Sequence, residues 1–194
     1  MPASTAAAAA AATGPSDPDP PLPEGAERCT VAAGCFWGVE HLYRRHFGEA
    51  LFGLRVGYTG GALEKPSYRA VCGGDTGHAE ATQIDFDPQK VSYRQLLEFF
   101  FRIHDPTTPN RQGPDTGSQY RSAIFYHSPE QETTARRVAA LASESWWRAA
   151  VVTQILPARR WWSAEEYHQL YLQRNPGGYE CPSHIVRDFP PLPE

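Results

Sequence analysis

The chain has 194 residues, of which 41% are hydrophobic and 21% charged, and its formal net charge is −4. This length and composition predict one globular domain with a core of its own. No stretch approaches eighteen consecutive apolar residues, so we expect no membrane-spanning helix. The slightly acidic balance argues against nucleic acid or an anionic membrane as a main partner.

The first 27 residues differ in composition from the rest. They hold an alanine run (Ala6–Ala12), several prolines, four acidic residues and no lysine or arginine. We expect residues 1–27 to be a disordered tail and residues 28–194 to be the single domain. The tail has neither the basic, leucine-type pattern of a secretory signal nor the arginines of a transit peptide, so we expect a cytoplasmic protein.

From residue 28 onward, the hydrophobic pattern alternates as in α/β proteins, which predicts a mixed, mostly antiparallel sheet with flanking helices. Strands are expected at 28–33, 51–58, 79–86, 122–126 and 151–156. Helices are expected at 35–47, 92–103, 128–142 and 164–174. Loops are expected around Pro66 and Tyr68, over 105–119, and in a flexible C-terminal segment from residue 175.

The four cysteines, Cys29, Cys35, Cys72 and Cys181, are too few and too scattered for a disulfide scaffold. They form no C-x2-C pair, so we expect no metal site. Cys35 follows a predicted strand at the start of a predicted helix, where free N–H groups and the helix dipole favour a thiolate. This position predicts a reactive thiol with a lowered pKa, whereas an arbitrary buried cysteine is more often inert packing.

The residues around Cys35 fit a ligand site. Gly34 and Gly38 allow a tight turn and the close approach of a ligand, and Phe36 and Trp37 can wall a small apolar pocket beside the sulfur. The run Gly34-Cys-Phe-Trp-Gly38 resembles the signature of the A-type peptide methionine sulfoxide reductases. Five further blocks agree in order: 57–61 (GYTGG), 66–68 (PSY), 71–80 (VCGGDTGHAE), 115–122 (DTGSQYRS) and 166–171 (EYHQLY).

The resemblance covers about residues 28–181, and it implies a ferredoxin-like two-layer core with long wrapping loops. It also implies reduction of methionine S-sulfoxide, protein-bound or free, to methionine. Cys35 would be the nucleophile that becomes a sulfenic acid. Glu80 would be an acid that is protonated near neutral pH. Tyr68 and Tyr120 would donate hydrogen bonds to the sulfoxide oxygen, and Asp115 would order the site and its water.

The resemblance assigns the second thiol as well. Cys181 lies at the general position of the family's resolving cysteine and would form a 35–181 disulfide, recycled by a thioredoxin-like reductant. No cysteine follows it, so we expect a single resolver. We also expect no bound cofactor and a monomer. Cys72 and Cys29 are expected to be packing residues, and His78 and His168 to be structural.

Two other classes of function stay open on the residues alone. A cysteine hydrolase would need a histidine base and an orienting Asn or Asp in contact with Cys35. A non-enzymatic module would bind methionine-containing peptides or a metal. Loss of activity with a histidine but not with Glu80 would indicate the hydrolase, and metal in the purified protein would indicate the metal-binding module.

Overall fold

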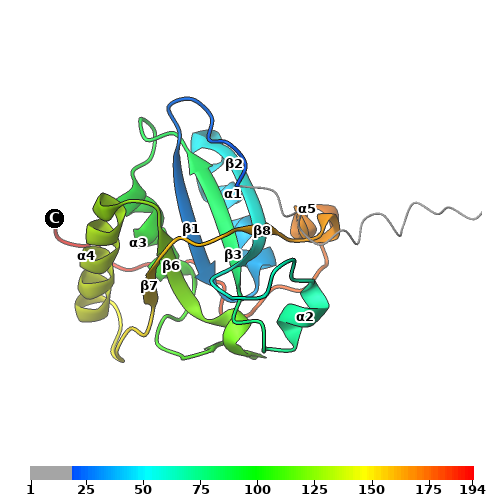
Figure 1. Ribbon diagram of the computed structural model, residues 1–194. Coiled ribbons are helices and arrows are strands. Elements are labelled where there is room, and N and C mark those ends of the chain that lie inside the picture. The colour runs from blue at the N-terminus through cyan, green and yellow to red at the C-terminus, as the bar shows by residue number, and fades with distance from the viewer. Residues whose placement is uncertain (1–18) are drawn as a thin grey trace, which may run out of the picture.

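The computed structural model describes residues 19–194, and its centre is a six-stranded sheet with the order β7-β6-β1-β3-β2-β8 (Figure 1). All neighbouring strands are antiparallel except β6 and β7. The strands are β1 (Glu27–Ala33), β2 (Leu51–Thr59), β3 (Ala79–Phe86), β6 (Ser122–Tyr126), β7 (Gln154–Pro157) and β8 (Trp162–Ser163). The helices are α1 (Phe36–Phe47), α2 (Tyr68–Cys72), α3 (Tyr93–Ile103), α4 (Pro129–Ser145) and α5 (Tyr171–Arg174).

The four inner strands confirm the expected ferredoxin-like core. Their order is β6-β1-β3-β2, with α1 connecting β1 to β2 and α3 connecting β3 to β6. This is a split β-α-β arrangement, in which β1 and β2 are parallel to each other and separated by β3. The mixed, mostly antiparallel sheet predicted from the pattern is therefore present.

The main core lies between the sheet and its helices. Cys29, Val31 and Ala33 alternate along β1 and all pack into this core, as expected from the period of two. Helix α3 begins with a capping box between Ser92 and Gln95, and it buries Leu96 and Phe100 completely. Because the sheet is fixed on this side, the end of β1 and the start of α1 are held in place.

The opposite face of the sheet is lined with small side chains. Ala32, Ala79, Ala81 and Ala123 are buried there with Trp161. The chain between β7 and β8 runs across this face and joins the two outermost strands (Figure 1). Alanines let the backbone pass close to the sheet, so one extended segment replaces a layer of helices.

The helix predicted over 164–174 is wrong. Residues Glu166–His168 form a single 3-10 turn, Leu170 has a left-handed backbone with φ of 56°, and only Tyr171–Arg174 are helical. The N–H of Leu170 donates to the Glu40 carboxylate at 3.0 Å instead of to a helical carbonyl. A long-range partner has therefore replaced the local helical hydrogen bond.

Two predicted loops contain regular structure. Tyr68 begins the short helix α2, because the Ser67 side chain accepts from the N–H of Ala70 and caps it. Within 105–119, β4 (Arg111–Gln112) pairs with β5 (Asp115–Thr116) in a small ribbon. The last predicted strand is displaced, from 151–156 to Gln154–Pro157.

Both ends of the chain bear on the predicted domain limits. Residues 1–18 of the predicted tail lie outside the described residues. Strand β1 begins at Glu27, one residue before the predicted strand, and the Arg28 guanidinium donates to the Pro20 carbonyl at 2.7 Å. Residues 175–194 form no helix or strand. Among the described residues, no helix is long and apolar enough to cross a membrane.

Candidate active site

Cys35 lies where β1 ends and α1 begins. Gly34, with φ of 90°, turns the chain out of the strand, and Cys35 is the residue immediately before the first helical turn. Its side chain is 7% exposed. Glu80, near the start of β3, is buried and accepts a hydrogen bond from the backbone N–H of Phe36 at 3.1 Å. The sheet and the helix start thus bring the predicted nucleophile and the predicted acid together.

The environment of Glu80 suits an acid at neutral pH. Burial raises its pKa to about 8, the N–H of Phe36 opposes that rise, and the charge of Asp115 adds to it. A carboxyl group with this pKa is mostly protonated at pH 7. The geometry therefore supplies a neutral proton donor next to Cys35.

The expectation of a lowered pKa for Cys35 is wrong. Burial of the thiol raises its pKa, and the nearby Glu80, Asp115 and Cys181 raise it further. The backbone N–H of Trp37 acts in the opposite direction, as expected of a helix start, but it is the weaker effect. Removal from water outweighs the helix end here, so the resting sulfur is a thiol.

The two predicted phenols lie beside this pair. Tyr68 on α2 and Tyr120, at the end of a 3-10 turn (Ser118–Tyr120), are both half-buried. Burial raises the pKa of each phenol, and the charge of Glu80 contributes to both shifts. Each hydroxyl therefore keeps its proton at neutral pH and can donate a hydrogen bond.

Asp115 begins β5 and is half-buried. The exposed hydroxyl of Tyr179 donates to its two carboxylate oxygens at 3.0 and 3.1 Å. The charge of Asp115 also raises the pKa of Cys35 and of Glu80. Asp115 thus joins the predicted cluster, and Tyr179 links it to the C-terminal segment.

An aromatic wall stands next to Cys35. Trp37 stacks on Tyr171 with ring centroids 3.7 Å apart, and its indole N–H donates to Nδ1 of His168 at 2.9 Å. The His168 ring also packs against Phe36 and Tyr68, with centroids 5.1 and 4.4 Å away. Burial lowers the pKa of His168 to about 4, so the ring is neutral and belongs to the wall.

Glu165 supports this region and was missed by the sequence analysis. Its buried carboxylate accepts from the Tyr58 hydroxyl at 3.2 Å, the Tyr167 hydroxyl at 2.9 Å and the backbone N–H of Tyr68 at 3.3 Å. It therefore fixes the start of α2 and with it the phenol of Tyr68. The sequence near residue 165 does not signal this role, because Tyr58 and Tyr68 lie 107 and 97 residues away.

Cys181 is buried although it lies in an irregular segment. Its side chain is 2% exposed, and its thiol donates to the Gln112 carbonyl at 3.5 Å. Its charge contributes to the pKa of Cys35, so the two thiols are neighbours across the fold. Cys29 is buried as expected, whereas Cys72 is exposed, which corrects its prediction as a packing residue.

The remaining predicted histidine is structural. Nδ1 of His78 accepts from the Gly61 N–H at 3.1 Å, and Nε2 bonds to the Leu63 carbonyl at 2.7 Å. Both ring nitrogens are therefore engaged in holding a loop. Nδ1 of His168 accepts from Trp37, so neither of the two predicted histidines bonds to Cys35, which disfavours the hydrolase hypothesis.

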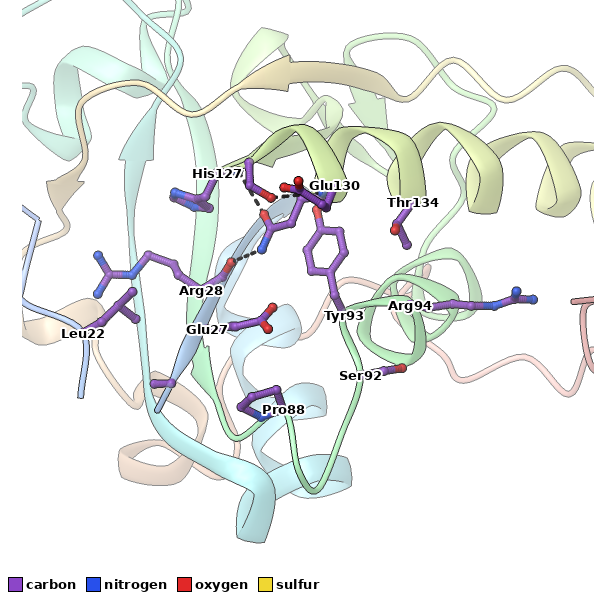
Figure 2. Close-up of a pocket in the computed structure, with 13 residues that line it drawn as sticks. Leu22, Glu27, Arg28, Pro88, Ser92, Tyr93, Arg94, His127, Glu130 and Thr134 are labelled. Carbon is purple, nitrogen blue, oxygen red and sulfur yellow. Dashed lines mark hydrogen bonds between the residues drawn. The ribbon is translucent and has the colours of Figure 1, made fainter. Parts of the chain in front are cut away.

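Other candidate sites lie away from this cluster. No group of three or more His, Cys, Asp or Glu residues within 19–194 could hold a metal ion. A cavity of about 740 Å³ lies instead between the starts of β1, α3 and α4, lined by residues such as Arg28, Tyr93 and His127 (Figure 2). No cysteine and none of the predicted site residues line this cavity, so it is not the site of the reactive thiol.

Comparison with known proteins agrees with the cluster. Residues 27–188 match the family model described as peptide methionine sulfoxide reductase. The chain belongs to this family. It is 53% identical over 160 residues to the probable peptide methionine sulfoxide reductase of Schizosaccharomyces pombe, covering 81% of this chain and 94% of the relative.

Solved structures of the family have the same fold. The reduced form of Mxr1 from Saccharomyces cerevisiae superposes with a TM-score of 0.82 at 43% identity, covering 86% of this chain and 94% of Mxr1. A second Mxr1 structure, in complex with Trx2, matches with a TM-score of 0.62 at 26% identity, covering 88% of this chain and 96% of that one. The predicted family and fold class are confirmed.

Proposed function

We propose that this reductase converts methionine S-sulfoxide, in oxidised proteins or free, to methionine and so repairs oxidative damage. The observation that carries the proposal is the contact of Glu80 with the first N–H of α1. It places an acid that is neutral at pH 7 beside the Cys35 thiol. Two phenols and an aromatic wall complete a site for a small, apolar sulfoxide.

In the first step, the Cys35 sulfur attacks the sulfoxide sulfur and the oxygen leaves it. Glu80 gives a proton to that oxygen, which is a poor leaving group until protonated, and regains the proton that leaves the Cys35 thiol. Tyr68 and Tyr120 donate hydrogen bonds to the same oxygen. The hydroxyl group then passes from the methionine sulfur to the Cys35 sulfur as the bond between the two sulfurs breaks. The products are methionine and a Cys35 sulfenic acid whose proton came from Glu80, and Glu80 holds the proton that left the thiol.

Substrate position follows from the walls of the site. Phe36 and Trp37 would hold the S-methyl group, and the stacked Tyr171 keeps the Trp37 ring in place. Asp115 is half-buried at the rim and faces the site from the opposite ribbon. We assign it to ordering the polar part of the substrate and the water near Glu80.

In the second step, the Cys181 thiol attacks the sulfenic acid, a 35–181 disulfide forms, and the oxygen leaves as water. An external dithiol protein of the thioredoxin type then reduces the disulfide and becomes oxidised itself. The complex of the related Mxr1 with Trx2 supports this choice of partner. The cycle needs no cofactor bound to the chain.

An assay on separated sulfoxide epimers tests the proposal. Purified protein with dithiothreitol should reduce the S epimer of a blocked methionine sulfoxide and leave the R epimer unchanged. A matched control is Cys72→Ser, which removes an exposed thiol that has no part in the proposed disulfide and leaves a hydroxyl to bond with the Tyr68 side chain, so it should keep wild-type turnover. Equal reduction of both epimers, or of neither, would contradict the proposal.

We also propose that the enzyme acts as a cytoplasmic monomer. The grouping of the proposed site residues within one chain supports the monomeric state. Light scattering at working concentration should give the mass of one chain, 21.5 kDa. Cell fractionation should place the protein with cytoplasmic markers.

A further inference from the structure

The imidazole of His184 lies directly against the glycines that flank Cys35. Its Nε2 bonds to the Ala33 carbonyl at 2.7 Å. A Cβ built on Gly34 would meet Nε2 at 3.3 Å, and a Cβ built on Gly38 would overlap the ring. The sequence predicted that these glycines admit a ligand, but here side chains of the same protein approach them: Gln112 and His184 at Gly34, and His184 at Gly38.

Gly38 is the more informative of the two. It lies inside α1 with a helical backbone, where glycine destabilises a helix by about 1 kcal/mol relative to alanine. Its φ is not positive, so the backbone does not require glycine. The three atoms nearest to an added Cβ all belong to the His184 ring. The contact with His184 therefore accounts for a glycine at this position.

The state of the imidazole follows from its neighbours. The Ala33 carbonyl can only accept, so Nε2 carries the proton, and the buried Nδ1 has no hydrogen-bond partner. A second proton on Nδ1 would place a buried positive charge at the positive end of α1. Burial also lowers the pKa of His184. The ring is thus neutral, and its one strong bond is to the strand that precedes Cys35.

His184 belongs to the turn that carries Cys181. Its backbone N–H donates to the Cys181 carbonyl at 2.9 Å, and the adjacent Ser183 hydroxyl bonds to the Gln112 side chain. The backbone carbonyl of Gln112 also accepts a hydrogen bond from the Cys181 thiol. To reach Cys35, the Cys181 sulfur must leave that carbonyl, while the bond of His184 to Ala33 involves neither sulfur.

We propose that His184 is a positioning residue for the resolving step, fastening the turn that carries Cys181 to the β1–α1 junction that carries Cys35. The anchor keeps the resolving thiol at a high effective concentration next to the sulfenic acid while the Cys181 side chain moves. This inference rests on the proposed function, because it assumes the 35–181 disulfide. It assigns a role to His184 and Gly38 together.

The test separates the two chemical steps. Reduced enzyme is mixed with one equivalent of S-sulfoxide without reductant, and methionine, sulfenic acid and disulfide are followed by rapid quench, dimedone trapping and peptide mass mapping. In His184→Ala, methionine should form at the wild-type rate. The disulfide should form roughly tenfold more slowly, the value of about one buried hydrogen bond, and trapped sulfenic acid should rise.

Two matched variants distinguish positioning from general damage. His184→Gln keeps an N–H that can reach the Ala33 carbonyl and should restore most of the disulfide rate. Gly38→Ala should displace the ring and slow disulfide formation as His184→Ala does. The double variant should be no slower than His184→Ala alone, since the clash has gone.

Each outcome decides the matter. Wild-type disulfide kinetics in His184→Ala would overturn the role of His184. A further slowing by Gly38→Ala in the absence of the imidazole would overturn the link between the two residues. If the wild type makes methionine but never a 35–181 disulfide, the resolving step of the proposed function fails, and this inference fails with it.

Discussion

Cys35 and Cys181 are both buried thiols, yet the two regions that hold them are built differently. Cys35 stands between a central strand and a helix, and its position is set by the sheet, by Gly34 and by the core behind α1. Cys181 stands in a segment without helix or strand, held by contacts to Gln112, Ala33 and Asp115. These contacts are separate hydrogen bonds, each worth about 1 kcal/mol, and not a continuous ladder.

The difference matches the work proposed for each thiol. The nucleophile must meet a small substrate in a fixed geometry, which a core junction provides. The resolver must leave its resting place once in every cycle, and a segment held by a few separate bonds can do so at low cost. A resolver built into a strand would have to break a ladder of hydrogen bonds to move.

The largest effect is expected at the fixed end. Cys35→Ser should abolish methionine formation completely, in the first turnover as well as in steady state, because it removes the thiol next to the Phe36 N–H that binds Glu80. The measurement is methionine released per enzyme after one equivalent of S-sulfoxide. Residual activity near the wild-type level would mean that another cysteine is the nucleophile.

At the movable end, loss of the thiol should remove only half of the cycle. Cys181→Ser should still release one methionine per enzyme in a burst, whereas turnover driven by thioredoxin should stop for want of a disulfide. Dithiothreitol should restore turnover by reducing the sulfenic acid directly. Thioredoxin-driven turnover equal to that of the wild type would show that Cys181 is dispensable.

Glu80→Gln tests whether the acid or the fixed geometry around Cys35 contributes more to the rate of the first step. The first step should slow by roughly two to four orders of magnitude, the usual value of a positioned acid. In the wild type, the rate should fall as pH rises through about 8, because the carboxyl group then loses its proton. Single-turnover rates from pH 6 to 10 give both results, and a wild-type rate in Glu80→Gln at pH 7 would exclude the acid role.

The smallest effect is expected where neither thiol is involved. Deleting residues 1–25 removes the contact of Pro20 with Arg28 and the partly exposed 3.7 Å ion pair of Asp19 with Arg28, which adds little stability, but Arg28 keeps its buried ion pair with Asp85 at 2.7 Å. The free energy of unfolding should change by no more than about 1 kcal/mol, the value of one hydrogen bond. Denaturant unfolding, with a deletion of residues 1–18 as the control, checks this, and a larger loss would show that residues 19–25 stabilise the domain.

The same contrast explains what could be predicted from the sequence. Local periodicity predicts strands such as β3 and the capped helix α3, and a sequence motif identifies Cys35. The surroundings of Cys181 could not be foreseen, because Gln112 lies 69 residues away in sequence. The failed helix at 164–174 has the same origin, since Leu170 is bound by Glu40 from 130 residues away.

The prediction of a lowered pKa for Cys35 failed for a different reason. A helix start does favour a thiolate, and the N–H of Trp37 acts in that direction. Local sequence shows the helix start but not how completely the thiol is removed from water, and desolvation is the larger effect. The six family blocks located most of the site, but only the fold shows that Glu165 and His184 support it.

The segment that crosses the alanine-lined face of the sheet has a consequence for solubility. It makes both outermost strands short: β8 has two residues, and β7 has four and ends at Pro157. At the β7 end, this strand pairs with residues 123–126 of β6 and is itself only four residues long, so few unpaired N–H and C=O groups are available at this rim to template another strand. An enzyme proposed to handle oxidised, partly unfolded chains would meet many exposed strands, and this rim gives them little on which to aggregate.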